Sequence, residues 1–61
     1  MDLREIRKSH SLTMRQAAEK LKISDATLSL IETGKRKPSI KIAKRISKLF
    51  KISLDEIYKD A

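Results

Sequence analysis

The chain has 61 residues, and its 15 Lys and Arg against 8 Asp and Glu give a formal net charge of +7. A chain of this length predicts one domain over residues 1–61, which buries only about 60% of the surface that the unfolded chain exposes. The absence of cysteine excludes disulfides, and a single histidine argues against a protein-only zinc or catalytic site.

The sequence also bears on where the protein works and what it binds. No apolar run approaches the roughly 18 residues of a membrane span, and no signal peptide is visible. We therefore expect a cytoplasmic protein without a metal or cofactor. The excess of positive charge favours nucleic acid, acidic membrane surfaces or acidic proteins as partners.

The first predicted helix covers residues 2–9. Leu3 and Ile6 are three positions apart and form its buried stripe, while Arg7 falls off that stripe. Asp2 places a negative charge at the helix N-terminus, where it is favourable. We interpret His10, after the helix, as a surface residue.

The second predicted helix begins after Thr13 and runs to about residue 21. Thr13 and Gln16 have the T-x-x-Q spacing of a capping box. Ala17 and Ala18 in its interior are small, which allows a second helix to cross close by.

A tight corner at Lys22 and Ile23 leads into the third predicted helix, over residues 24–33. The corner requires one residue near the left-handed region, where Lys22 costs about 1 kcal/mol and glycine would be unstrained. Ser24 is a good N-cap and Gly34 a good stop for this helix. Two short helices joined by such a turn form a helix-turn-helix, whose second helix can enter the DNA major groove.

The exposed face of this third helix is small and weakly charged, without Lys or Arg. A generic phosphate-binding face would be basic, whereas a face that fits against base edges can have this composition. The positive charge lies further on, because residues 35–51 contain eight basic residues and no acid.

The fourth predicted helix follows the basic loop Lys35-Arg36-Lys37 and has Ser39 as its N-cap. Its apolar residues fall on one broad face: Ile40, Ala43, Ile46, Leu49 and Phe50. A basic amphipathic helix can also lie on a membrane. We disfavour that alternative, because this face is needed to bury the first three helices.

A last short helix is predicted after Ser53, which forms an S-x-x-E capping box with Glu56. Leu54, Ile57 and Tyr58 give it a large apolar surface. They either complete the core or form a dimer contact.

These motifs together resemble the phage-repressor and Cro-like helix-turn-helix family, also called the XRE family, over residues 3–58. The matching segments stand in register along the chain: Leu12-Thr13, Ala18-Glu19-Lys20-Leu21, Ile23-Ser24, Ile31-Glu32-Thr33-Gly34-Lys35, Pro38-Ser39 and Ile52-Ser53-Leu54-Asp55-Glu56-Ile57. The resemblance implies an all-α, five-helix lambda-repressor-like domain that binds double-stranded DNA, usually as a homodimer, in a prokaryote or phage.

The resemblance also implies roles for particular residues. The positions for base readout are Ser24, Asp25, Ala26, Ser29 and Leu30. The positions for the DNA backbone are Thr13, Arg15, Lys22, Thr33, Lys35, Arg36 and Lys37. Glu32 matches an acid that pairs with an arginine of the first helix, here Arg7, which makes Arg7 structural rather than a DNA contact.

The chain departs from the family pattern at the start of the second helix and at the corner. Met14 stands where the family often has a glutamine that contacts phosphate, and Lys22 stands at the corner glycine. Base readout would then rest on Ala26 against a thymine methyl group and on Ser29. Asp25 either accepts a hydrogen bond from a cytosine amino group or only strengthens the helix N-terminus.

The leading hypothesis is a sequence-specific transcriptional regulator, most simply a repressor, that binds a palindromic operator as a homodimer. The alternative is an antitoxin-like interaction module that works with a partner protein through Leu54, Ile57 and Tyr58. A third option is non-specific compaction of nucleic acid. An enzyme is not expected, since the sequence has no base–nucleophile pair or metal cluster.

Overall fold

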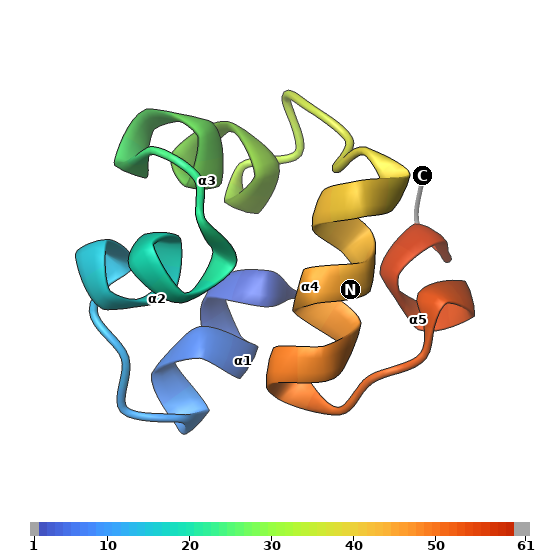
Figure 1. Ribbon diagram of the computed structural model, residues 1–61, viewed down its shortest axis with the longest axis horizontal. Coiled ribbons are helices and arrows are strands. Elements are labelled where there is room, and N and C mark those ends of the chain that lie inside the picture. Colours follow the sequence, from blue (N-terminus) through green and yellow to red (C-terminus); the bar gives the residue numbers. More distant parts are fainter. Residues whose placement is uncertain (1, 60–61) are drawn as a thin grey trace.

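The computed structural model describes residues 2–59 and contains five helices in that part of the chain, with no strand there. The helices are α1 (Leu3–Ser9), α2 (Met14–Leu21), α3 (Asp25–Glu32), α4 (Ile40–Phe50) and α5 (Leu54–Tyr58). In Figure 1, α4 runs through the middle of the view, with α2 and α3 on one side and α5 on the other. This architecture confirms the predicted five-helix all-α fold with α2 and α3 as the helix-turn-helix.

Every one of these five helices begins at a residue whose side-chain oxygen accepts a hydrogen bond from the backbone N–H three positions later. The N-caps are Asp2, Thr13, Ser24, Ser39 and Ser53. At Thr13 the capping box is complete, because the side chain of Gln16 also accepts from the N–H of Thr13 at 2.9 Å. At Ser53 the structure has only the bond from the N–H of Glu56, so the predicted box is half formed.

The first four helices end in the same way, at a residue with positive φ: Ser11, Lys22, Gly34 or Lys51. The N–H of the following residue donates to the carbonyl five positions earlier, as in a Schellman motif. Only one of the four residues is glycine. Three of the residues that follow are Leu12, Ile23 and Ile52, which are partly buried against the core. Their burial offsets the strain of the left-handed residue before them.

The core consists of residues from all five helices. Leu21, Leu28 and Ile46 are the largest side chains that are fully buried. Ala17 and Ala18 are also buried, and α2 packs against both α3 and α4. The small side chains therefore lie where a close crossing was expected. Phe50 is buried too, and its ring meets the ring of His10 edge-on at 5.0 Å, so this exposed histidine rests against the core.

One prediction about burial was wrong. Ile40 does not lie on the buried face of α4, since 58% of its surface is exposed at the first residue of the helix. Arg7 lies off the periodic apolar stripe of α1 and is buried because it contacts the carboxylate of Glu32, the partner that the resemblance implies for it. The prediction of one domain over 1–61 includes residues 1, 60 and 61, which lie outside the described residues.

The conformation at the corner between α2 and α3 gives a stability prediction. Lys22 has φ 59° and ψ 43°, as the sequence predicts. Lys22→Gly should raise the free energy of unfolding by about 1 kcal/mol, because glycine adopts this conformation without strain. In a thermal melt that gain corresponds to roughly 4–8 °C. Lys22→Ala keeps the Cβ and is the matched control, and an equal gain from alanine would contradict the explanation.

Candidate nucleic-acid interface

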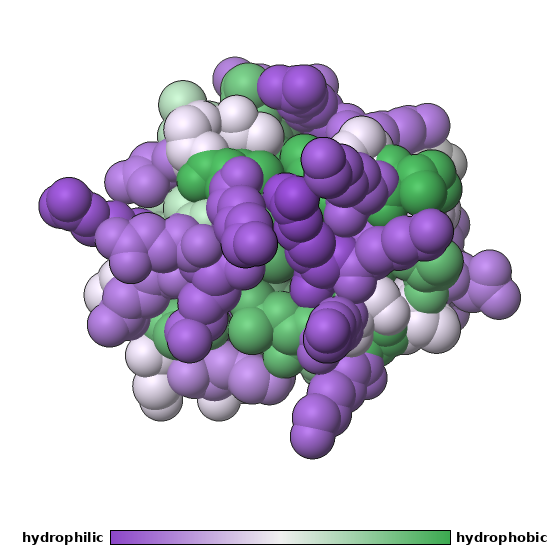
Figure 2. All heavy atoms as spheres, in the orientation of Figure 1, coloured by the Kyte–Doolittle hydropathy of each residue, from purple (hydrophilic) through white to green (hydrophobic). Residues whose placement is uncertain are grey.

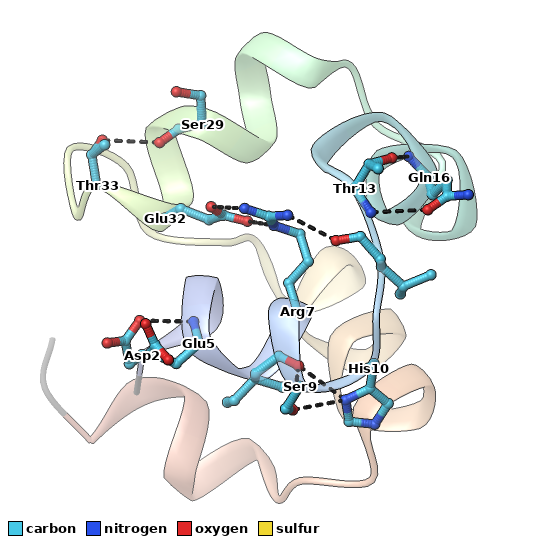
Figure 3. A network of polar contacts seen from close by, with 12 residues as sticks. Asp2, Glu5, Arg7, Ser9, His10, Thr13, Gln16, Ser29, Glu32 and Thr33 are labelled. Atoms are coloured by element: carbon cyan, nitrogen blue, oxygen red, sulfur yellow. Dashed lines mark hydrogen bonds and ion pairs between the residues drawn. The ribbon is translucent and has the colours of Figure 1, made fainter.

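An ion pair between α1 and α3 fixes the orientation of the helix-turn-helix. Nε of Arg7 donates to Oε2 of Glu32 at 2.8 Å, and Nη1 donates to the carbonyl oxygen of Leu12, also at 2.8 Å (Figure 3). The side chains of Arg7 and Glu32 are only 9% and 4% exposed. Arg7 thus links α1, the loop before α2 and the end of α3, and it is not free to contact DNA.

One face of α3 presents a small, nearly neutral surface. Asp25, Ala26 and Ser29 are exposed, and Leu30 beside them is 39% exposed. Opposite them on the same helix, Leu28 and Ile31 are buried. The structure thus brings four of the five residues predicted for base readout together on one exposed face.

The fifth residue, Ser24, is already engaged within the protein. Its hydroxyl accepts from the N–H of Thr27 at 3.1 Å and donates to Oγ1 of Thr27 at 2.8 Å. Thr33 is similar, because its hydroxyl donates to the carbonyl oxygen of Ser29 at 2.9 Å. A phosphate oxygen only accepts hydrogen bonds, so Thr33 must give up this bond before its hydroxyl can donate to one.

The basic loop after α3 is held in place by its backbone. The N–H groups of Lys35 and Arg36 both donate to the carbonyl oxygen of Leu30, at 3.0 and 3.2 Å. The side chains of Lys35, Arg36 and Lys37 are exposed. Three cations therefore stand directly beyond the C-terminal end of the exposed α3 face.

The other residues predicted for the DNA backbone lie on α2 and at its ends. Thr13 caps α2, and Lys22 is exposed at the corner. Arg15 is exposed and lies 4.0 Å from the carboxylate of Glu19 on the same helix. A contact of this length between exposed side chains contributes little to stability, so Arg15 is available for a phosphate.

The apolar residues of α5 mostly pack against the core of the same chain. Ile57 is 5% exposed, and Leu54 and Tyr58 are half-buried against the core. The hydroxyl of Tyr58 donates to the carbonyl oxygen of Pro38 at 3.0 Å, which ties α5 to the segment before α4. Of the three predicted dimer residues, only Leu54 and Tyr58 retain surface for a partner.

Sequence reasoning missed the role of Arg45. In the sequence it is only one of the eight basic residues of 35–51, but in the structure it is half-buried, and its Nη1 donates to the carbonyl oxygen of Leu21 at 3.2 Å. It therefore caps the C-terminal end of α2. No spacing rule marks a long side chain that reaches a backbone carbonyl of another helix.

Comparison with known proteins places this geometry in a family. A family model described as Helix-turn-helix matches residues 3–57. The chain is 39% identical over 56 residues to an uncharacterised HTH-type transcriptional regulator of Methanocaldococcus jannaschii, covering 92% of this chain and 85% of that protein. No solved structure matches the chain at a significant level. The chain belongs to the XRE-type helix-turn-helix family of DNA-binding transcriptional regulators.

Other relatives are longer than the chain. The HTH-type transcriptional activator BcrR of Enterococcus faecalis is 38% identical over 55 residues, which are 90% of this chain and 27% of that protein. An HTH-type transcriptional regulator of Bacillus subtilis, YobD, is 36% identical over 90% of this chain and 49% of its own length. The similarity to them thus lies in the domain that carries the helix-turn-helix. Within residues 2–59, no helix is long and apolar enough to cross a membrane.

Removing one partner of the buried ion pair should strongly destabilise the fold. Arg7→Met leaves the carboxylate of Glu32 desolvated without a cation, which costs on the order of 3–5 kcal/mol. A domain of this size has little more stability than that. We expect loss of helical circular dichroism at room temperature.

The double variant Arg7→Met/Glu32→Leu serves as the control, because it replaces both charges with apolar groups and should recover much of the loss. A melting curve for Arg7→Met that matches the wild type would show that the pair does not hold α1 to α3.

Proposed function

We propose that the protein is a sequence-specific transcriptional repressor that binds a palindromic operator as a homodimer, with α3 in the major groove. The observation that carries the proposal is the contrast between α3 and the segment after it. The exposed face of α3 has no cation, whereas the anchored loop directly after it has three. This division suits a helix that reads base edges and a flank that holds phosphates.

Phosphate contacts would supply most of the affinity. The loop of Lys35, Arg36 and Lys37 lies at the end of α3, where the duplex backbone passes a helix seated in the major groove. Thr13, Arg15 and Lys22 add contacts from α2 and the corner. Base discrimination would come from Ala26, Ser29 and Leu30, with Asp25 facing a cytosine amino group or only supporting the helix N-terminus.

A twofold dimer would present two α3 helices about 34 Å apart, so that each reads one half-site of the operator. The exposed parts of Leu54 and Tyr58 on α5 are the proposed contact between subunits. Occlusion of RNA polymerase from a promoter by such a dimer would make the protein a repressor, acting in the cytoplasm.

Selection of bound sequences from random DNA duplexes tests whether α3 recognises the base sequence. The wild type should enrich a palindrome and bind it with two chains per duplex, as measured by sedimentation. Ala26→Glu and Ser29→Glu should each weaken binding more than tenfold, because one lost base contact is worth about 1–3 kcal/mol and the new carboxylate faces phosphates. Glutamate is a good helix former, so the fold should persist.

Lys8→Gln is the control for this selection, because it makes the same change of charge at an exposed position of α1. It should bind nearly as the wild type does. If no sequence is enriched at low salt, the protein is not a sequence-specific regulator. A complex with one chain per duplex would instead contradict the homodimer.

The salt dependence of binding tests the role of the basic loop. The three cations of the loop, with one phosphate contact each, predict a contribution of about −5 to the slope of log K against log salt for a dimer on a duplex little longer than the operator. Replacing Lys35, Arg36 and Lys37 together with glutamine should remove most of that slope. The sequence preference should remain, because α3 is unchanged. An unchanged slope with a lost preference would show that the loop, and not α3, reads the bases.

A further inference from the structure

A second positively charged surface lies between the C-terminal end of α2 and the C-terminal half of α4. It is a groove of about 440 Å³ lined by Lys20, Lys22, Arg45, Lys48 and Leu49. Four of these five residues are cations and none is an acid. In Figure 2, long hydrophilic side chains gather over the middle of the face where, in Figure 1, the end of α2 meets α4.

The four cations differ in how firmly they are held. Arg45 is half-buried and bonded to the carbonyl oxygen of Leu21, so its guanidinium is a fixed part of the wall. Lys20, Lys22 and Lys48 are exposed. Capping of α2 accounts for Arg45 but not for three lysines around it, because like charges gathered without a carboxylate repel one another. A bound anion would relieve that repulsion.

The backbone at Lys22 determines where its side chain lies. Its left-handed conformation costs a lysine about 1 kcal/mol that glycine would not incur. The same left-handed conformation ends α1, α3 and α4, so it belongs to the helix stop and is not by itself a sign of a site. Here the strained position places an ammonium group in the lining of the groove.

We propose that this groove binds phosphate groups of the DNA backbone outside the half-site that α3 reads, on the same duplex; the proposal rests on the proposed function. The lining suits phosphates and not a nucleoside, because it has no aromatic ring to stack on a base and no neutral polar side chain to hold a sugar or a base edge.

The position of the groove suits a flank of the bound duplex. Lys22 stands two residues before Ser24, the N-cap of α3, so the groove begins beside the N-terminal end of the recognition helix. Arg45 and Lys48 continue it about 8–12 Å along α4 from Ile40, near which the basic loop ends. Backbone contacts would therefore flank α3 on two sides, one from the loop and one from the groove.

The experiment compares a short duplex, little longer than the selected operator, with a long duplex that adds about ten base pairs, or one helical turn, on each side. The variant Lys20→Gln/Lys48→Gln removes two groove charges and leaves Arg45 to cap α2. We expect wild-type binding on the short duplex. On the long duplex we expect binding more than tenfold weaker at 0.1 M salt and a salt slope shallower by about 3.6 for the dimer, from about 0.9 for each of two lysines in each of two subunits.

The variant Lys8→Gln/Lys59→Gln is the matched control, because both lysines are exposed and neither lines the groove. It should behave as the wild type on both duplexes. Equal binding of the long duplex by the groove variant and the wild type would overturn the proposal. An equal loss of affinity for the short and the long duplex would overturn the proposal as well. The proposal would also be overturned if the groove variant lost only complexes in which the protein joins two duplexes.

The outcomes separate this proposal from the proposed function. If the groove variant still prefers the operator and binds the long duplex as tightly as the wild type does, the proposed phosphate site in the groove is refuted and the proposed function is not. A wild type that enriches no sequence refutes sequence-specific regulation. In that case the same comparison on random short and long duplexes still decides whether the groove binds phosphates.

Discussion

The bond between Arg7 and Glu32 is the constraint on which the proposed DNA-facing part of the molecule depends. Glu32 is the last residue of α3, and its side chain is 4% exposed, so its carboxylate has lost nearly all its water. The guanidinium of Arg7 replaces that water and also satisfies the carbonyl of Leu12. One side chain thus sets the angle of α3 relative to α1 and the start of α2. The direction in which the exposed residues of α3 point therefore depends on the side chain of Arg7.

Much of the fold could be predicted from local signals. The five N-caps and the apolar spacing place the five helices almost to the residue. The helix ends were harder, because only Gly34 carries the usual sign of a left-handed stop. At Ser11, Lys22 and Lys51 the sequence signal for the helix end is instead the apolar residue that follows. Burial of that residue against the core stabilises the turn in the chain. Of these three residues only Lys22 was expected in this conformation, from the tight corner and from the glycine that the family has there.

Apolar periodicity predicted the candidate site where residues act alone and not where they act through others, and only the resemblance implied the pair of Arg7 and Glu32. Exposure of Asp25, Ala26 and Ser29 follows from the spacing of Leu28 and Ile31. Periodicity failed for Arg7 because a period describes apolar side chains and says nothing of a cation that meets a carboxylate 25 residues later. Periodicity also failed to predict the role of Arg45, because the partner of Arg45 is a backbone carbonyl, a group that every residue has.

The hydrogen bonds within the protein also limit what α3 can offer to a base pair. Ser24 and Thr33 have committed their hydroxyl hydrogens, whereas the hydroxyl of Ser29 makes no bond within residues 2–59. What remains on the exposed face is one hydroxyl, one carboxylate and the apolar side chains of Ala26 and Leu30. Apolar groups discriminate mainly through the thymine methyl group. In the proposed complex, recognition by such a face would depend more on fit than on bidentate hydrogen bonds, so the fixed angle of α3 would be all the more important.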